Sequence, residues 1–307
     1  MSQRSLASKS HQPDGPDQVG QHLAAAGGSG IERSCGLLGP SESLVQAPVV
    51  RGIERIEMRF HGVMYEPHRH DTYGLGLTLS GVQTFRYRGA SRAGTPGDII
   101  ILHPDELHDG AAGDEQGLSY RMLYLPPERL IEASDGSDRL PFVPAPVIRD
   151  EAFRLCLAEA LIDLEGEPAD LALDDLIARI AASLWQHADA AGGARMSAVA
   201  REAVFRCRDY LRDHLHRSVS SQELEAITGF DRYTIARQFR RVFGTSPHHY
   251  VVLRRLDYAK TLLLGEEPLA GIAVHSGFAD QAHFTRHFKK AFGITPGHWR
   301  RLAGVAV

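Results

Sequence analysis

The sequence predicts a two-domain α+β protein: an N-terminal β-barrel with a helical connector, then a C-terminal all-α domain with two helix-turn-helix units. A motif that occurs twice near the C-terminus predicts the second domain. Short strand-like segments between glycines and prolines predict the barrel. The C-terminal part is basic while the rest of the chain is acidic, which separates the two domains by charge.

The repeated motif occupies Leu224–Tyr250 and Ile272–Trp299. Both copies carry Gly-Phe, then an Arg, then Phe followed by two basic residues, and both close with Phe-Gly-x-(Ser/Thr)-Pro. Two short helices around a glycine turn are the pattern of a helix-turn-helix. Two such units on one chain indicate a protein that contacts DNA twice.

Helix signals in the first copy follow one another in the expected order. Ser220 and Glu223 have the spacing of a capping box, so a helix is expected to begin there, and Gly229 supplies a turn residue that tolerates positive φ. The next helix is expected to begin near Asp231, to bury Ile235, Phe239 and Val242, and to end at Gly244. The second copy carries corresponding signals at Pro268, Gly277, Phe284, Phe288 and Gly293. The two units are therefore expected at about 220–243 and 268–292.

The exposed face of each second helix is the candidate DNA-reading surface. It offers Arg232, Tyr233, Thr234, Arg237, Gln238, Arg240 and Arg241 in the first unit, and Gln281, His283, Arg286, His287, Lys289 and Lys290 in the second. Arg bonds bidentately to guanine and Gln to adenine, while Tyr, Thr and His contact bases or phosphates. The alternative is a solvated face on an ordinary helical bundle, which the duplication and the segregated charge disfavour.

Charge supports the nucleic-acid interpretation. From Arg195 onward the chain has 18 Lys and Arg against 10 Asp and Glu, a balance of about +8, whereas the whole chain of 307 residues carries −4. The part before Arg195 therefore carries about −12. A basic domain on an otherwise acidic protein is typical of nucleic-acid binding.

On these residues the C-terminal part resembles the DNA-binding domain of AraC/XylS-type transcriptional regulators. The matching residues are Gly229, Arg237, Phe239, Phe243-Gly244 and Pro247 in the first copy, and Gly277-Phe278, Asp280-Gln281, His283-Phe284, Arg286, Phe288, Phe292-Gly293 and Pro296 in the second. The resemblance implies that a long helix at about Pro247–Leu264 joins the units, and that their second helices enter two successive major grooves. By position it implies base contacts from Tyr233, Ala236 and Arg237, and from Gln281, Ala282, His283 and Arg286. The two alanines offer only a methyl group.

Residues 53–125 predict β structure. Ile53–Met58, Thr84–Arg88 and Leu118–Leu125 are strand-like, and Asp98–Leu102 predicts a buried strand. The order Gly62, His68-x-His70, Gly81, Pro96-Gly97-Asp98 and His103 to His108 is similar to a cupin. That resemblance implies a barrel like the sensor half of many AraC-type regulators.

The polar segment Glu66–Tyr73 raises two functional alternatives for the barrel. His68, His70 and His108 are candidate metal ligands through their imidazole nitrogens. Cupin enzymes usually add a Glu at the place where this chain has Gly74, so we predict no metal, no cofactor and no catalytic residue. The same three histidines and Tyr73 are candidates for a pocket that holds a small effector with a carboxylate or hydroxyl group. A structural role, in which they cap strand ends and bond loops, stays open.

Two helices are expected between the domains, at Glu151–Glu165 and Leu171–His187. The second has an apolar stripe made of Leu173, Leu176, Ile177, Ile180 and Leu184. Such a stripe packs either onto its own sheet or onto a partner; the family resemblance implies a homodimer through these helices. Ala190–Ala194 predicts a flexible linker, and Ser197–His216 the first helix of the DNA-binding domain.

The rest of the chain sets bounds. The sequence has no apolar run of the roughly 18 residues that a membrane span needs, and its N-terminus lacks a signal-peptide pattern. Cys35, Cys156 and Cys207 form no metal spacing and suggest a reducing compartment. We therefore expect a cytoplasmic, bacterial protein without membrane partners. The expected boundaries are 1–47 disordered, 48–190 barrel with its helices, 191–196 linker, and 197–307 DNA-binding domain.

The sequence thus predicts a sequence-specific DNA-binding transcriptional regulator whose barrel senses a small molecule, and not an enzyme. Its expected partners are double-stranded DNA, the effector, a second copy of the chain and, for an activator, RNA polymerase. Two alternatives stay open. One is a cupin metal-binding protein or metalloenzyme fused to a DNA-binding domain, and the other is an effector-independent DNA-binding dimer.

Overall fold

The computed structural model describes residues 42–134, 139–189 and 196–304, all within one compact unit, Leu37–Val307. Residues 1–41 of the expected disordered segment and the expected linker at Ala190–Ala194 lie outside the described residues. No helix in the described part of the chain is both long and apolar enough to cross a membrane.

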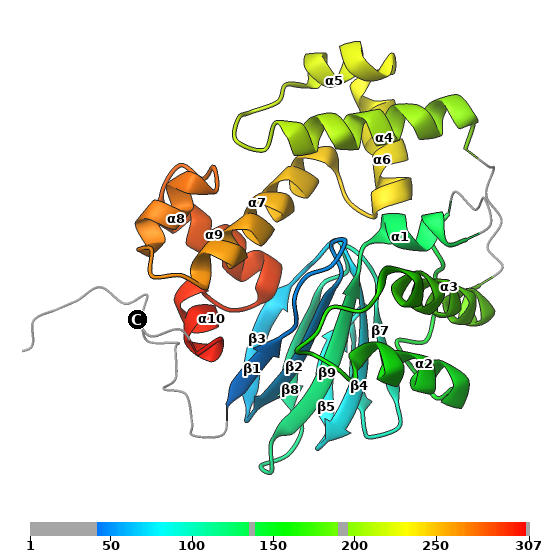
Figure 1. The fold of residues 1–307 in the computed structure, drawn as a ribbon, viewed down its shortest axis with the longest axis vertical. Helices are drawn as coiled ribbons and strands as arrows, with labels where there is room; N and C mark the ends of the chain where they lie inside the picture. Colours follow the sequence, from blue (N-terminus) through cyan, green and yellow to red (C-terminus); the bar gives the residue numbers. More distant parts are fainter. Residues whose placement is uncertain (1–41, 135–138, 190–195, 305–307) are drawn as a thin grey trace, which may run out of the picture. The chain divides into compact units, whose positions relative to one another are not determined.

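The N-terminal part is a cupin-like arrangement of two antiparallel sheets (Figure 1). In spatial order the larger sheet contains β1 (Ser43–Gln46), β2 (Glu54–Phe60), β9 (Leu118–Leu125), β4 (Tyr73–Ser80), β7 (Ile99–Leu102) and β10 (Val147–Ile148). The smaller sheet contains β3 (Val63–His68), β8 (His108–Ala112), β5 (Gln83–Tyr87) and β6 (Ala90–Gly94).

Strand β4 illustrates how alternation divides the core into two parts. Tyr73, Leu75 and Leu77 belong to the core on the helix side of the larger sheet. Gly74 and Gly76 lie on the opposite face, because successive residues of a strand point to opposite sides. A Cβ on Gly76 would lie 2.3 Å from the sulfur of Met122, so glycine leaves the room that the Met122 side chain occupies inside the barrel.

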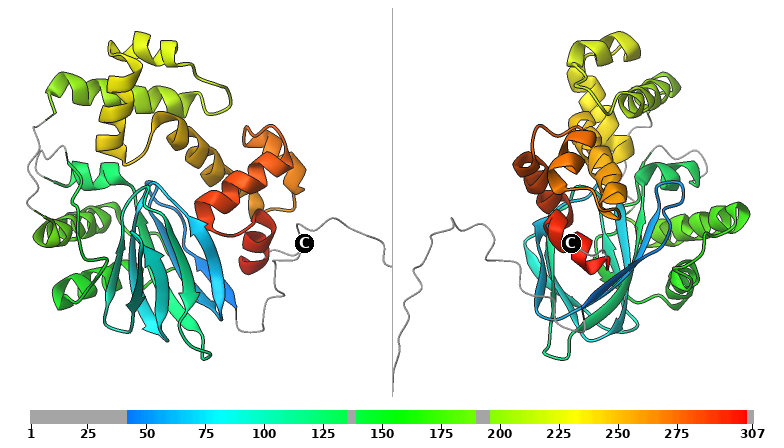
Figure 2. Two further views of the ribbon diagram at one scale, coloured as in Figure 1. Left: turned by 180° about the vertical axis from the view of Figure 1, so that it is seen from behind. Right: turned by 60° about the vertical axis from the view of Figure 1, so that its left-hand side comes forward.

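Three connector helices follow the barrel: α1 (Pro127–Glu132), α2 (Glu151–Leu161) and α3 (Asp170–His187). Helices α2 and α3 cover the outer face of the larger sheet, and the predicted apolar stripe of α3 is buried in the core there (Figure 2). Asp150 caps α2 by accepting from the Phe153 amide, and it also lies 2.8 Å from His187 at the end of α3. Of the two alternatives for the stripe, packing onto its own sheet is therefore confirmed.

The C-terminal part is entirely helical. It contains α4 (Ala198–Asp213), α5 (Ser221–Thr228), α6 (Arg232–Phe243), α7 (Pro247–Leu263), α8 (Leu269–His275), α9 (Gln281–Phe292) and α10 (Pro296–Leu302). Ser246 and Thr295 each accept a bond from the third residue of the following helix, and each is followed by a proline at the first helical position. These matching caps reproduce the sequence repeat as a structural repeat.

The structure corrects two expectations and adds a strand that was not predicted. Ser43–Gln46, placed in the disordered segment, is strand β1 and pairs with β2. Helix α2 ends at Leu161 and not at Glu165, because Asp163 turns the chain by accepting bonds from the Glu165 and Gly166 amides. The sequence did not predict β4, because Gly74 and Gly76 have low strand propensity, even though Tyr73, Leu75 and Leu77 alternate with them.

Candidate DNA interface and effector cavity

The first helix-turn-helix unit is built by the predicted capping signals. Ser220 and Glu223 form a reciprocal capping box at the start of α5, and Gly229 ends that helix with a φ of 73°. Asp231 caps α6 by accepting from the amides of Tyr233 and Thr234. This turn orients α6 so that its apolar stripe, including the fully buried Phe239, faces α4.

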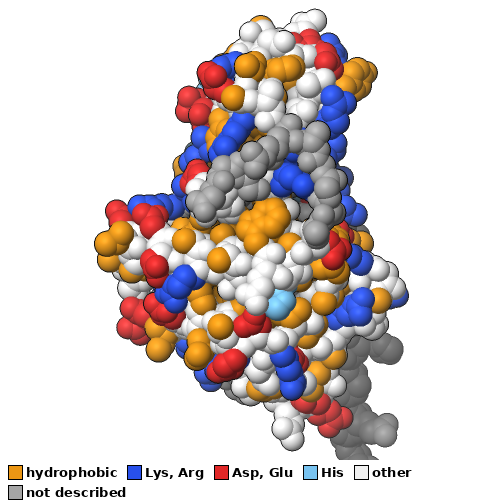
Figure 3. Space-filling model, turned by 90° about the vertical axis from the view of Figure 1, so that its right-hand side faces the viewer, with side chains coloured by type: hydrophobic (Ala, Val, Ile, Leu, Met, Phe, Trp, Pro, Cys, Tyr) orange, Lys and Arg blue, Asp and Glu red, His pale blue; other side chains and the backbone are white. Residues whose placement is uncertain are grey.

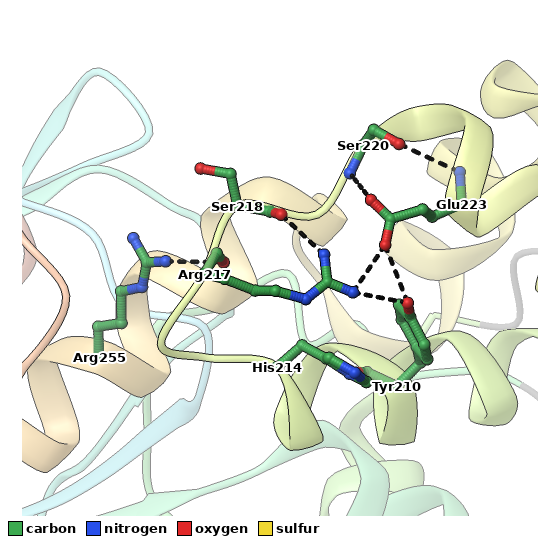
Figure 4. A network of polar contacts seen from close by, with 7 residues as sticks. All are labelled: Tyr210, His214, Arg217, Ser218, Ser220, Glu223 and Arg255. Carbon is green, nitrogen blue, oxygen red and sulfur yellow. Dashed lines mark hydrogen bonds and ion pairs between the residues drawn. The ribbon is translucent and has the colours of Figure 1, made fainter.

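A polar network attaches this unit to the linking helix α7 (Figure 4). The Glu223 carboxylate accepts from Arg217 at 2.7 Å and from the Tyr210 hydroxyl at 2.9 Å. The bond from Arg217, together with the Ser220 amide, lowers the pKa of Glu223. Arg255 on α7 donates to the carbonyls of Leu215 and Arg217, so the loop before α5 is fixed to the linking helix.

The second unit repeats the design. Gly277 turns the chain with a φ of 82°, Asp280 caps α9 by accepting from the His283 amide, and Gly293 ends α9 with a φ of 73°. Phe284 and Phe288 are fully buried, as predicted. Helix α7 has 17 residues, so it separates the two units by roughly 26 Å at 1.5 Å per residue.

The predicted reading residues divide into an exposed group and a half-buried group. The exposed ones are Arg232, Tyr233, Arg237 and Arg240 on α6, and Gln281, Arg286 and Lys290 on α9. Among them Arg232 is ion-paired with Glu225 at 2.9 Å, which makes it part of the α5–α6 turn. The neighbouring Ala236 is half-buried and Ala282 is exposed.

The half-buried group consists of the remaining predicted residues, Thr234, Gln238, Arg241, His283, His287 and Lys289. Thr234 accepts a bond from Arg237 at 3.3 Å, and Arg241 is also half-buried. An amide oxygen of Gln238 is buried without a protein partner. His283 and His287 pack on each other and on Phe278.

Two half-buried residues of α9 are not free cations: His287 has a lowered pKa, and Lys289 is held in an ion pair. Burial and the neighbouring His283 lower the pKa of His287 to about 4, so this ring is neutral near pH 7. Lys289 is ion-paired at 2.8 Å with Glu66 at the edge of the barrel.

A cavity of about 110 Å³ lies inside the barrel, next to the second helix-turn-helix unit. The predicted His68, His70 and His108 meet on its wall, with ring centroids 4.2, 4.8 and 6.3 Å apart. They come together because β3 ends at His68 and β8 begins at His108, and these two residues pair across the smaller sheet. All three side chains are buried.

Tyr73 does not join this cluster. Its side chain lies on the helix side of β4, where the hydroxyl donates to the Pro141 carbonyl at 2.7 Å. The expectation that Tyr73 lines the pocket is therefore corrected, and the alternation of β4 is the reason. The nearby aromatic residues that do line the cavity are Tyr65, Tyr120 and Tyr124.

The cavity wall also contains residues of the DNA-binding domain that were not predicted to line a pocket. Leu253, Arg254, Asp257 and Lys260 of α7 line it, as do Ala291, Phe292, Ile294 and Trp299. Arg254, Asp257 and Lys260 are charged residues among the buried apolar residues of a long helix, and this is the sequence signal that could have found them. Apolar residues of the barrel interior and of the second unit form a single buried cluster.

Charged pairs cross from α7 to the barrel. Arg254 bonds both carboxylate oxygens of Asp71 at 2.9 Å and lies 3.2 Å from Asp257, while Lys260 is paired with Glu54. Burial alone would lower the pKa of Arg254, but the charges of Asp257 and Asp71 raise it above its ordinary value. Burial raises the pKa of Asp257 to about 6.

Backbone contacts join α9 directly to the histidine cluster. The Glu66 amide donates to the Gly293 carbonyl at 3.1 Å, and the Arg69 amide donates to the Lys290 carbonyl at 3.2 Å. A Cβ on Gly293 would lie only 2.8 Å from Nδ1 of His68. The end of the second reading helix thus touches a residue of the cavity wall.

The described residues contain no group of three or more His, Cys, Asp or Glu side chains arranged to hold a metal ion. At the place where a cupin enzyme has its Glu, a Cβ on Gly74 would lie 3.4 Å from the His70 ring. Gly74 therefore faces the histidine cluster. A Glu at this position would point toward the three histidines, but this chain has no carboxylate there.

Comparisons with known proteins agree with both halves. A family model described as AraC-like ligand binding domain matches residues 51–181, and a model described as helix-turn-helix domain matches residues 224–302. The HTH-type transcriptional regulator YbfI of Bacillus subtilis is 27% identical over 232 residues, which are 73% of this chain and 84% of YbfI. YisR of the same species is 26% identical over 67% of this chain and 77% of its own length.

Among solved structures, ToxT of Vibrio cholerae bound to an unsaturated fatty acid has a TM-score of 0.59 at 14% identity. The match covers 89% of this chain and all of the ToxT chain, and it shows a shared two-domain fold. The chain therefore combines an AraC-like ligand-binding domain with a helix-turn-helix DNA-binding domain, which is the domain combination of AraC/XylS-type transcriptional regulators.

Proposed function

We propose that the DNA binding of this regulator is controlled by a small effector held in the cavity between the barrel and the second helix-turn-helix unit. One observation carries the proposal: the cavity wall is shared between the two domains, with His68, His70 and His108 on one side and Leu253, Ala291 and Trp299 on the other. A ligand in this position contacts both domains at once.

A shared wall supplies a physical route for control. A ligand shifts an equilibrium only when it binds one arrangement of the protein better than another. Here a group that displaced His68 would press on Gly293, and with it on the end of α9. In the docked arrangement Glu66 holds Lys289, so undocking would release a cation of the second reading helix for DNA.

The test uses a cavity-filling variant. A thermal-shift screen of small metabolites identifies binders, and the affinity of the full chain for its operator is measured with and without each one. Ile56 lines the cavity, so Ile56→Phe is expected to abolish the effector response while DNA binding persists. The matched control is Ile177→Phe in the helix-side core, which overpacks the protein without touching the cavity. An unchanged response in Ile56→Phe would refute this location.

We further propose that Arg237 and Arg286 read bases, since they occupy equivalent places on α6 and α9 and are both exposed. Each alanine substitution is expected to cost about 1–3 kcal/mol on the specific site and to relax sequence preference locally. Arg240→Ala and Lys290→Ala are the comparison variants. They are expected to weaken specific and random DNA alike and to flatten the salt dependence. Equal loss on specific and random DNA in Arg286→Ala would contradict the base-reading role.

We also propose that the regulator acts as a homodimer, and that an activating form contacts RNA polymerase. The side of the molecule that carries α2 and α3 has hydrophobic side chains among charged ones (Figure 3). Leu155 of α2 and Leu171 of α3 are 54% and 83% exposed. The double variant Leu155→Glu/Leu171→Glu is therefore expected to sediment as a monomer at concentrations where the wild type is dimeric. A dimer that persists in this variant would place the interface elsewhere.

A further inference from the structure

The three cavity histidines share one hydrogen-bonding arrangement. In each ring Nδ1 lies against a backbone carbonyl two residues away: Glu66 for His68, Thr72 for His70 and Glu106 for His108, at 2.8, 2.8 and 2.9 Å. A carbonyl oxygen only accepts hydrogen bonds, so in each pair Nδ1 must be the donor and must carry the proton. The Thr72 hydroxyl also lies 3.2 Å from Nδ1 of His70, but the carbonyl contact is shorter, so the backbone favours the same tautomer in all three rings.

The second nitrogen of each ring is then a bare acceptor. Burial lowers the pKa of all three histidines, that of His70 to about 3, so none of the rings carries a second proton near neutral pH. A neutral imidazole protonated at Nδ1 offers only a lone pair at Nε2. Nε2 of His70 is buried and has no hydrogen-bond partner in the protein. A buried polar atom without a partner is costly, and on a cavity wall a bound group can supply the missing hydrogen bond.

His103 provides the contrast within the same barrel. It is equally buried, but both of its nitrogens are occupied: Nδ1 lies 2.9 Å from the Tyr87 hydroxyl, and Nε2 accepts from the Val143 amide at 3.0 Å. His103 therefore has the satisfied arrangement expected of a structural histidine. His70 differs from it, because its Nε2 has no partner in the protein, and this difference favours a binding role.

The charges around the cavity point the same way. The cations among the described lining residues, Arg254 and Lys260, are already paired with Asp71, Asp257 and Glu54. Asp109 adds a further acid to the wall, so acids outnumber bases. An anionic ligand would meet imidazole lone pairs and a net negative wall, both of which repel it.

We infer that the effector presents hydrogen-bond donors and no negative charge, as a hydroxyl or an amino group does, to Nε2 of His68, His70 and His108. The inference rests on the proposed effector function. Met58, Phe85 and Met122 form the apolar part of the wall and suit a hydrocarbon or aromatic body. At about 110 Å³ the cavity approaches the roughly 150 Å³ that holds benzene, so the buried part of the ligand is small.

The sequence suggested a carboxylate or a hydroxyl group on the effector, and of these only the hydroxyl suits the three histidines. A carboxylate has no donor for the three nitrogens at neutral pH, whereas a hydroxyl or an ammonium does. Three imidazoles are also the donor set of a divalent metal, but the described side chains are not arranged for one and Gly74 supplies no carboxylate. Zinc is therefore a competing outcome of the test.

The test is a matched panel of three probes on one aromatic ring: benzyl alcohol, benzylamine and benzoate. Their binding to the full chain is measured by calorimetry at neutral pH, with zinc alone as a fourth arm. The alcohol and the amine are expected to bind at least about tenfold tighter than benzoate, a difference of about 1.4 kcal/mol. His70→Phe keeps a ring of similar size but removes the acceptor, and is expected to erase this preference. His216→Phe, exposed and outside the cavity, is expected to keep it.

The wild-type panel decides even if His70→Phe does not fold. Tighter binding of benzoate would overturn the donor inference and leave the effector function standing. Stoichiometric zinc that blocks the probes would overturn it in favour of a metal site. If no probe binds and the metabolite that occupies the cavity is an anion without hydrogen-bond donors, the inference fails alone. If the cavity takes neither probe nor metabolite, the proposed effector function fails with it.

Discussion

Replacing Arg254 by methionine is expected to destabilise the folded protein by about 3–5 kcal/mol. Arg254 bonds both oxygens of Asp71 and lies 3.2 Å from Asp257, and its side chain is only 19% exposed. Methionine fills much of the same volume, so the loss comes from the carboxylates that remain buried without their counterion. The free energy of unfolding from denaturant titration measures the effect.

Two controls separate this cause from simple loss of packing. The double variant Arg254→Met/Asp71→Leu removes both charges and is expected to recover part of the lost stability, because fewer charges stay unpaired. Stability of the single variant should also depend on pH. Burial raises the folded-state pKa of Asp257 to about 6, above that of an unfolded chain, and loss of Arg254 raises it further. The folded state then binds the proton more tightly, so Arg254→Met should gain stability as pH falls from 8 to 5.

If Arg254→Met were as stable as the wild type at pH 8, the ion pair would not hold in solution. The contact between α7 and the barrel would then rest on apolar packing alone.

The sequence predicts those parts of the fold that depend on contacts between residues close together in the chain. The repeat, the caps at Ser220, Asp231 and Ser246, and the glycine C-caps all depend on residues close in sequence, and the structure has each where the pattern indicated. The pair between Asp71 and Arg254 joins residues 183 positions apart. No local pattern carries that information, so the docking of α7 on the barrel was missed.

The effector cavity was predictable in part. The spacing of His68 and His70 and the later His108 sufficed to bring three histidines into one hypothesis, and the structure gathers them. The alternation of Tyr73, Leu75 and Leu77 places Tyr73 on the apolar face of a strand, away from the histidines, but Gly74 and Gly76 hide that strand from a propensity-based prediction. The tautomer of each cavity histidine depends on which backbone carbonyl its Nδ1 contacts, and that contact forms only in the folded chain.

Gly293→Ala is expected to cost about 2–4 kcal/mol of stability and to loosen the second unit from the barrel, while Gly229→Ala is expected to cost only about 1–2 kcal/mol. Both glycines end a helix with a φ of 73°, so alanine carries the same backbone strain at either place. At Gly229 a Cβ meets nothing within 4 Å. At Gly293 it would lie 2.8 Å from Nδ1 of His68 and 2.9 Å from the Glu66 carbonyl oxygen.

The difference between the two variants therefore isolates the domain contact. Hydrogen exchange at the Glu66 amide, which donates to the Gly293 carbonyl, is expected to accelerate in Gly293→Ala and to stay protected in Gly229→Ala. Gly293→Ala should also respond less to an effector, because the proposed control of DNA binding runs through this contact. Equal stability losses and unchanged exchange in the two variants would mean that α9 does not rest on the barrel in solution, and control would then need a route other than His68 and Gly293.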